Sequence, residues 1–140
     1  MPTPDAAVLE RLRQAAGEAA ARAYAPYSNF HVGAALLFED GAVVTGCNVE
    51  NVSYGLTSCA ERNALFRAVS ERGAGRRIVA VAVANRNDAA SPPCGACRQV
   101  LSEFATPAAV VCFPGESGPE TRTLAELLPC SFHFEPQRGT

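Results

Sequence analysis

The stretch "RIVAVAVA", residues 77–84, is a nearly continuous run of apolar and β-branched side chains. A strand with one face in water alternates apolar and polar residues, and this run does not. It therefore predicts a strand that is buried on both faces of a sheet.

The residues before this run predict a helix and a hairpin. The alanine-rich residues 4–24 favour a helix, with Asp5 near its start. Strand-like runs at 31–38 and 42–50 lie on either side of an Asp-Gly pair at 40–41, which is typical of a tight hairpin turn. The chain is thus expected to enter the sheet through two adjacent strands.

Helical and strand patterns alternate in the second half. Residues 59–73 and 94–104 have helical spacing, 108–113 form a further strand-like run, and 123–129 favour a short helical turn. The Pro/Gly-rich residues 113–123 indicate a surface loop. Strands that alternate with helices predict an α/β domain with helices packed on a mixed sheet.

Length and composition fit one globular domain. The chain has 140 residues, of which 48% are hydrophobic and 19% charged, and it contains no internal repeat or linker. Residues 1–140 are therefore expected to form a single domain.

Charge and the N-terminal sequence limit the partners. A formal net charge of −2 and a pI of about 5.7 provide no general positive field to attract a nucleic acid polymer or an anionic membrane. The N-terminal residues lack the pattern of a signal peptide, and no run reaches about 20 apolar residues. A cytoplasmic location is expected, in which the six cysteines stay reduced.

Two cysteines open the helix expected at 94–104. Cys94 and Cys97 are three residues apart, so both sulfurs can face one ion, and the positive helix end favours thiolates. This is half of a tetrahedral zinc site, although a C-x-x-C also fits a redox pair or two core thiols.

Cys59 is the best candidate for a third ligand, because it also begins an expected helix that follows a strand and a loop. Three protein ligands leave one position of a tetrahedral ion open, as in catalytic zinc sites. Glu61 lies too close in sequence to share the ligating face, but it is near enough for proton transfer beside the metal. An isolated histidine in place of Cys59 stays an alternative.

The other cysteines and the two histidines have simpler interpretations. Cys47, Cys112 and Cys130 are expected to be small, buried or half-buried apolar side chains. His31 and His133 lie in no cluster with ligand spacing and are not assigned to zinc.

Several ordered blocks resemble the small cytidine deaminases. They are "YSNFHVGAALL" at 27–37, "GCNVENVSYGLTSCAERNAL" at 46–65, "PCGACRQVL" at 93–101, and "ELLP" at 126–129 with Phe132 after it. The C-A-E and P-C-x-x-C elements follow the pattern of zinc deaminases. The resemblance implies a three-layer fold with a mixed five-stranded sheet flanked by helices.

The same resemblance implies the activity and the roles of individual residues. The expected reaction is zinc-dependent hydrolytic deamination of cytidine and deoxycytidine to uridine and deoxyuridine, with release of ammonia, in pyrimidine salvage. One Zn²⁺ per subunit would be held by Cys59, Cys94 and Cys97, with Glu61 moving protons and Arg62 bonded to ligand sulfurs. Phe30, Asn48, Glu50 and Ala60 would bind the nucleoside.

The resemblance also implies a homotetramer in which Val52, Tyr54 and Phe132 reach a neighbouring subunit. Phe134 competes with Phe132 for that role, because the tail after Pro129 departs from the common family pattern. Other functions stay open: a deaminase of a modified nucleoside or of a base in nucleic acid, a structural zinc module in which Glu61 caps a helix, or a redox protein built on Cys94 and Cys97.

Overall fold

The computed structural model describes residues 4–134 and contains four helices, one short 3₁₀ turn and five strands within that range. The elements are α1 (Ala6–Ala20), β1 (Val32–Phe38), β2 (Val43–Cys47), the 3₁₀ turn η1 (Tyr54–Leu56), α2 (Ala60–Arg72), β3 (Ile78–Asn85), α3 (Gly95–Ser102), β4 (Ala105–Gly115), β5 (Gly118–Thr123) and α4 (Leu124–Leu127).

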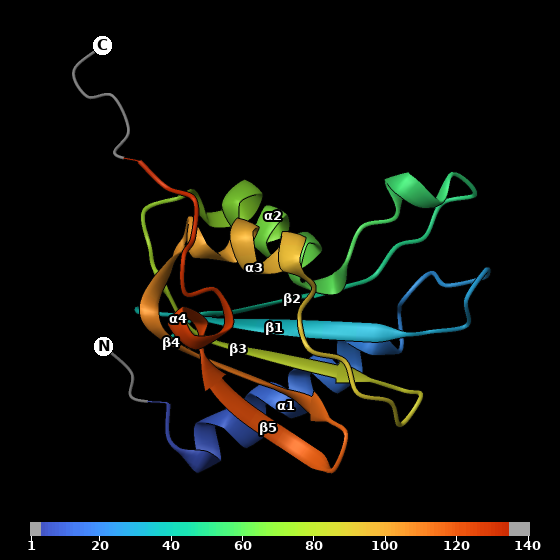
Figure 1. The fold of residues 1–140 in the computed structure, drawn as a ribbon, viewed down its shortest axis with the longest axis horizontal. Helices are drawn as coiled ribbons and strands as arrows, with labels where there is room; N and C mark the ends of the chain where they lie inside the picture. The colour runs from blue at the N-terminus through green and yellow to red at the C-terminus, as the bar shows by residue number, and fades with distance from the viewer. Residues whose placement is uncertain (1–3, 135–140) are drawn as a thin grey trace.

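The five strands form one mixed sheet in the order β2-β1-β3-β4-β5. Strand β3 is central, antiparallel to β1 and parallel to β4, while β1–β2 and β4–β5 pair antiparallel. Residues 78–83 are buried on both faces of the sheet. Helix α1 covers one face and α2 and α3 cover the other (Figure 1). The predicted three-layer fold with a five-stranded sheet is confirmed.

Each face of the sheet has its own hydrophobic core. Leu12 and Ala16 of α1 pack with Leu37, Val79 and Cys112 on one face. On the other face, buried side chains of the helices and the sheet form a second cluster that includes Leu36, Leu65, Val81, Leu101 and Val111. The sheet therefore fixes where the N-terminal ends of α2 and α3 lie.

Glycines allow two helices to approach the sheet closely. A Cβ atom on Gly33 would lie 1.9 Å from the Ala16 carbonyl oxygen of α1, and one on Gly46 would lie 2.4 Å from the Ala64 nitrogen of α2. Real Cβ atoms do not approach backbone so closely. The "HVGAALL" and "TGCN" segments thus bring α1 and α2 against the sheet.

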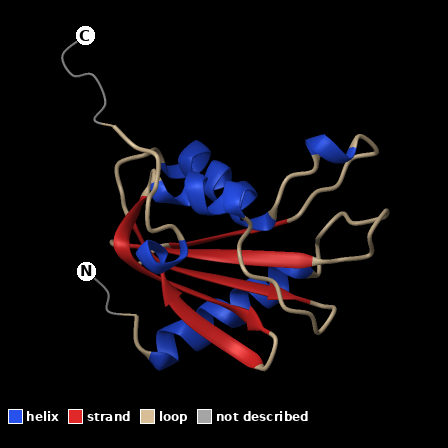
Figure 2. Ribbon diagram, viewed as in Figure 1, coloured by secondary structure: helices blue, strands red, loops and turns tan. Residues whose placement is uncertain are grey.

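The predicted surface loop at 113–123 is wrong. Residues Gly118–Thr123 form β5, which pairs with β4 through a turn containing Gly118 at a φ of 125° (Figure 2). Strand β5 is an edge strand, and most of its side chains are exposed. Proline is tolerated at an edge, so the Pro/Gly-rich composition that suggests a loop is compatible with a strand here.

Several element ends also differ from the prediction, among them the start of β4, which lies at Ala105 and not at 108. The first helix ends at Ala20 rather than near Tyr24, and the second strand ends at Cys47 rather than Glu50. The two segments beyond these ends pair with each other: Tyr24 N–H donates to the Asn48 carbonyl at 3.0 Å, and Glu50 N–H donates to the Tyr24 carbonyl at 2.8 Å.

Within residues 4–134, no helix is long and apolar enough to cross a membrane.

Candidate active site

Two helix N-termini bring three cysteines together. Cys59 is the N-cap residue of α2, Cys94 is the N-cap residue of α3, and Cys97 lies in the first turn of α3. Their sulfur atoms lie within 4.8 Å of one another, and the Cys59 and Cys94 sulfurs are 3.9 Å apart. Both helix dipoles present their positive ends, which favour thiolates, to this cluster.

The cluster fits a tetrahedral zinc ion. Two sulfurs bound at about 2.3 Å to one tetrahedral ion lie about 3.8 Å apart, close to the Cys59–Cys94 separation of 3.9 Å. Among the described residues, these three cysteines form the one group of potential ligands, and neither Glu61 nor a histidine belongs to it. The alternative of an isolated histidine as third ligand is therefore not supported.

Arg62 supplies positive charge to the cysteines. Its Nη2 donates to Cys59 Sγ at 3.2 Å. Hydrogen bonds from Cys97 and then from Arg62 lower the pKa of the Cys59 thiol, whereas the contact with Cys59 and burial raise the pKa of Cys97. A bound dication would favour the thiolate form of all three, because thiolate is the ligand form of cysteine.

Glu61 lies at the start of α2 and is only 5% exposed. Burial raises the pKa of its carboxyl to about 7, and the charge of Cys59 acts in the same direction. A group with a pKa near the working pH can both accept and release a proton. Glu61 is therefore suited to general acid and base chemistry.

A cavity of about 440 Å³ opens next to these groups. The lining residues come from the β1 entry, the β2–α2 segment, β3 and the loop before α3: Ser28, Phe30, Val32, Asn48, Glu50, Thr57, Cys59, Ala60, Glu61, Val83, Ala90, Ser91, Pro92 and Cys94. Every residue expected to bind the nucleoside is among them. A larger depression of about 640 Å³ lies beside the β4–β5 turn, where no cluster of potential metal ligands is found among the described residues.

Asn48 and Glu50 hold the cavity wall as well as lining it. Asn48 Nδ2 donates to the Phe30 carbonyl at 2.8 Å, and its Oδ1 accepts from Val32 N–H at 2.9 Å. The Glu50 carboxylate accepts from the Ser28 hydroxyl and from the N–H groups of Tyr27 and Ser28. The hydrogen bond from the Ser28 hydroxyl is the main cause that keeps the pKa of Glu50 below its usual range.

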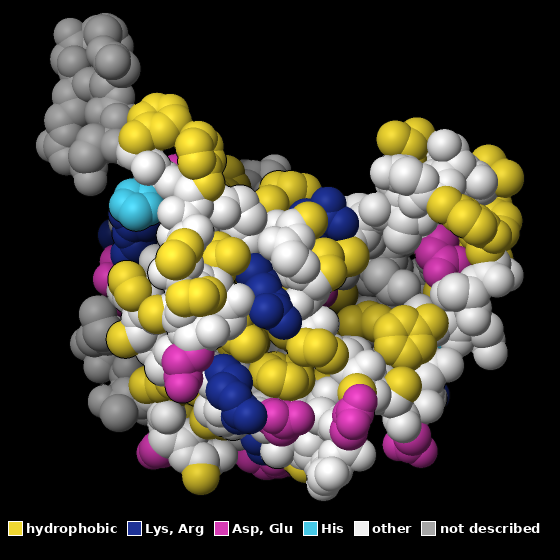
Figure 3. Space-filling model, in the orientation of Figure 1, with side chains coloured by type: hydrophobic (Ala, Val, Ile, Leu, Met, Phe, Trp, Pro, Cys, Tyr) yellow, Lys and Arg dark blue, Asp and Glu magenta, His cyan; other side chains and the backbone are white. Residues whose placement is uncertain are grey.

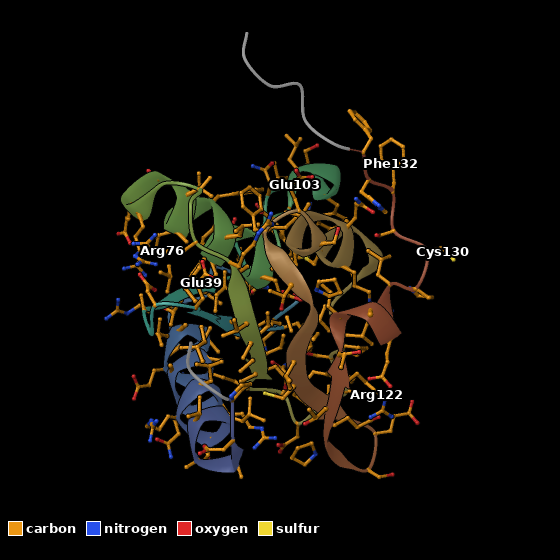
Figure 4. The ribbon with its side chains drawn as sticks, turned by 90° about the vertical axis from the view of Figure 1, so that its left-hand side faces the viewer. Glu39, Arg76, Glu103, Arg122, Cys130 and Phe132 are labelled. Atoms are coloured by element: carbon orange, nitrogen blue, oxygen red, sulfur yellow. The ribbon has the colours of Figure 1, made fainter. Side chains whose placement is uncertain are left out.

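The expected inter-subunit residues lie outside this cavity. Val52, Tyr54 and Phe132 are 76%, 72% and 74% exposed. Figure 3 shows hydrophobic side chains gathered over the projecting loop between β2 and α2 and over the C-terminal segment. Phe132 lies at the outer edge of the molecule (Figure 4), and its ring makes an edge contact with that of Phe134 at 5.9 Å.

The remaining cysteines differ in exposure. Cys112 is buried and Cys47 is half-buried, as predicted, but Cys130 is exposed, so its prediction is wrong. Cys130 follows Pro129 after the short helix α4, and its side chain points away from the body (Figure 4). All six cysteines are free thiols in the structure.

Arg98 and Asn63 are supporting residues that the sequence reasoning missed. Arg98 donates to the Pro93 carbonyl at 2.8 Å and to the Leu127 carbonyl at 2.9 Å, which fixes the segment before Cys94. Asn63 donates to the Cys47 carbonyl at 2.8 Å and accepts from the Ser58 hydroxyl at 2.7 Å, which ties α2 to β2. The sequence offers one indication of their role: each is a polar residue that directly follows a cysteine-containing motif, C-A-E-R for Asn63 and C-G-A-C for Arg98.

The comparisons agree with this geometry. Residues 7–113 match the family described as the cytidine and deoxycytidylate deaminase zinc-binding region. The chain is 53% identical over 116 residues to a cytidine deaminase of Halalkalibacterium halodurans, which covers 81% of this chain and 85% of the relative. The crystal structure of cytidine deaminase from Mycobacterium tuberculosis has a TM-score of 0.78 at 46% identity, covering 89% of this chain and 97% of that one.

A solved structure from a third organism is similarly close to this chain. The structure of cytidine deaminase from Burkholderia pseudomallei also has a TM-score of 0.78 at 46% identity and covers 88% of this chain and 98% of that chain. The fold and the cysteine-glutamate site define a zinc-dependent deaminase. The chain belongs to the cytidine deaminase family.

Proposed function

We propose that the protein deaminates cytidine and deoxycytidine, consuming one water and releasing ammonia to give uridine and deoxyuridine. The observation that carries the proposal is the meeting of three cysteines with the buried Glu61 beside one cavity. A structural zinc module would have no need of an open cavity at the metal or of a buried carboxyl whose pKa is raised to about 7. A redox pair would have no need of Cys59.

Cys59, Cys94 and Cys97 would hold one zinc ion per subunit. Zinc bound there supplies Lewis acidity, which makes water a nucleophile at neutral pH. Three thiolates and one dication leave a formal charge of −1, which weakens that acidity. The guanidinium of Arg62, bonded to Cys59 at 3.2 Å, offsets part of this charge.

Glu61 would move the protons of the reaction. Its carboxylate takes a proton from the attacking water and delivers it to ring N3 of cytosine. The same carboxylate then takes the remaining proton from the oxygen now bonded to C4 and delivers it to the amine, so the C4–N bond breaks as the C4 carbonyl forms. The nitrogen leaves as ammonia, so atoms and charge balance. Burial of Glu61 supports this cycle because the carboxyl exchanges protons readily near neutral pH.

The walls of the cavity would bind the nucleoside. Phe30, which lines the cavity, would pack its ring against the base, and Asn48 and Glu50 would bond the sugar. Ala60, which also lines the cavity, would contact the base through its backbone. Aromatic packing suits a planar heterocycle, and hydrogen-bonding groups that a substrate must pair give strong selection for hydroxylated ligands.

The exposed apolar residues support a homotetramer, in which Val52, Tyr54 and Phe132 of one subunit would contact the next. Contiguous apolar patches on a soluble chain mark interaction sites. Sedimentation analysis of the purified protein tests this assembly.

We also propose a cytoplasmic location and a single domain over residues 1–140. A role in pyrimidine salvage is proposed because the products are free nucleosides.

The test is turnover in paired samples. Absorbance spectra of cytidine and of deoxycytidine are followed with the native protein and with Glu61→Gln, which keeps the size of the side chain. We expect the native protein to convert both, and the variant to lose about 10²-fold to 10⁴-fold in kcat while retaining zinc and its thermal midpoint. Turnover of the variant at the native rate would refute the role of Glu61. No turnover by the native protein with zinc bound would refute the proposed activity.

A further inference from the structure

Residues 29–32, which lead into β1, accept hydrogen bonds from and donate them to asparagine side chains on both sides. On one side, Asn48 bonds the carbonyl of Phe30 and the N–H of Val32. On the other side, Asn87 Nδ2 donates to the Asn29 carbonyl at 2.8 Å and Asn87 Oδ1 accepts from His31 N–H at 3.1 Å. Bonds made alternately to both sides are the pattern of a strand inside a sheet.

Asn87 therefore brackets Phe30. Its two hydrogen bonds go to the residues directly before and after Phe30. The N–H of Phe30 itself donates to the Ser28 hydroxyl at 3.0 Å, and its carbonyl accepts from Asn48. The backbone on which the aromatic wall of the cavity is mounted is thus held by three side chains.

The turn before Phe30 has an uncommon backbone conformation. Asn29 has a φ of 59°, in the left-handed region that non-glycine residues adopt infrequently. Conformations of this kind persist where the surrounding structure over-determines them. The Asn29 carbonyl also lies 3.2 Å from His31 Nδ1, and the Asn29 N–H donates to the Ala25 carbonyl at 3.0 Å. Removing the bond from Asn87 therefore weakens this turn without releasing it.

Asn87 is itself well placed to act as a clamp. Asn85 Oδ1 accepts from Asn87 N–H at 3.0 Å, and Asn85 Nδ2 donates to the Ala89 carbonyl at 2.8 Å, so the loop after β3 is closed on itself. The same loop continues to residues 90–92, which line the cavity. Asn87 thus ties together two segments that both contribute residues to the cavity lining.

We propose that Asn87 is a positioning residue that sets the affinity of the enzyme for its nucleoside by fixing Phe30 in the cavity wall. Asn87 is not among the residues that line the cavity, so it acts through Phe30 and not by contact with the ligand. This inference rests on the proposed nucleoside deaminase activity.

The kinetic test uses Asn87→Ala with Arg86→Gln as its control. Arg86 is exposed on the same loop and reaches the segment through its backbone N–H, which donates to the His31 carbonyl at 3.0 Å. Asn87→Ala removes both hydrogen bonds of the Asn87 amide. We expect KM for cytidine to rise about tenfold, within the range that one or two lost hydrogen bonds give, with kcat nearly unchanged. Asn87→Asp should raise KM at least as much, because its carboxylate cannot donate to the Asn29 carbonyl that it would face. Arg86→Gln should match the native enzyme.

A double-mutant cycle shows whether the effect passes through Phe30. In a Phe30→Ala background, Asn87→Ala should raise KM no further, because the ring it positions is gone. Equal effects of Asn87→Ala in both backgrounds would overturn the inference, as would an unchanged KM in the single variant.

Hydrogen exchange separates this inference from the proposed function. Asn87→Ala should speed exchange of the His31 amide, whether or not cytidine is a substrate, because that N–H loses its acceptor. Unchanged exchange overturns the clamp. Native protein that shows no turnover, together with faster exchange in the variant, overturns the proposed function and leaves the clamp standing.

Discussion

Arg62 Nη2 lies 3.2 Å from Cys59 Sγ, and the two residues occupy one turn at the start of α2. The contact raises the pKa of Arg62, so the cation is permanent. The Nε atom of Arg62 is buried and lacks a partner among the described residues. A charged side chain held in this way costs desolvation, and the compensation is its bond to the anionic sulfur.

Replacing Arg62 with Gln should reduce activity without unfolding the protein. The glutamine keeps a donor but removes the charge, so the sulfurs become more negative and a bound zinc a weaker Lewis acid. We expect a loss of about 10-fold to 100-fold in kcat, measured by steady-state kinetics on protein whose zinc content equals that of the native enzyme. Arg67→Gln is the control, since Arg67 bonds Glu71 and Thr45, away from the site. Native kinetics in Arg62→Gln would contradict the role.

Cysteine substitutions should divide into two groups. Cys97→Ser removes a buried sulfur of the cluster, and we expect the purified protein to contain much less than one zinc per chain, measured by elemental analysis. Cys130→Ser changes an exposed thiol outside the cluster and should keep full zinc content. Equal zinc content in the two variants would show that the metal, if bound, lies elsewhere.

Local patterns made the site predictable from sequence. The pairs Cys94–Cys97 and Cys59–Glu61 depend on helix starts, which the sequence marks well, and the buried run at 77–84 placed both helices on one sheet. The resemblance supplied Phe30, Asn48 and Glu50, all of which line the cavity.

Contacts between distant segments were not predictable. Asn87 and Arg98 bond backbone groups far away in sequence, and such pairs leave no periodic signal. Strand β5 was missed because an edge strand with exposed side chains has no apolar alternation. Nothing in the sequence indicates that the side-chain amide of Asn48 hydrogen-bonds the backbone of Phe30 and Val32.

The close packing of β2 against α2 can be tested with alanine. In Gly46→Ala the new methyl group would lie 2.4 Å from the Ala64 nitrogen and 2.8 Å from the carbonyl oxygen of Ala60, the residue before Glu61. We expect the free energy of unfolding to fall by about 1–3 kcal/mol, with a loss of activity as α2 shifts. Gly17→Ala in α1 meets nothing within 4 Å and should instead stabilise by about 0.5–1 kcal/mol. Urea denaturation of both variants measures the contrast, and equal effects would contradict it.

The hydrogen bonds to Glu50 predict how stability depends on pH. Donation from the Ser28 hydroxyl, and from the Tyr27 and Ser28 N–H groups, keeps the pKa of the folded carboxyl below its ordinary value of 4.5. The folded state therefore binds fewer protons than the unfolded state in this range. The stabilisation is fully present above pH 4.5 and is lost as the pH falls through the lower, folded value.

Glu50→Gln removes this titration while keeping the size of the side chain. We expect the variant to have a lower urea midpoint than the native protein at pH 7, and the difference between their midpoints to shrink as the pH falls below 4.5, since protonation weakens the native carboxylate there. Glu10→Gln in α1 is the control, because Glu10 lies on the exposed surface and bonds only Arg13 among the described residues. A gap between native protein and Glu50→Gln that stayed constant across this range would mean that Glu50 acts through packing and not through its charge.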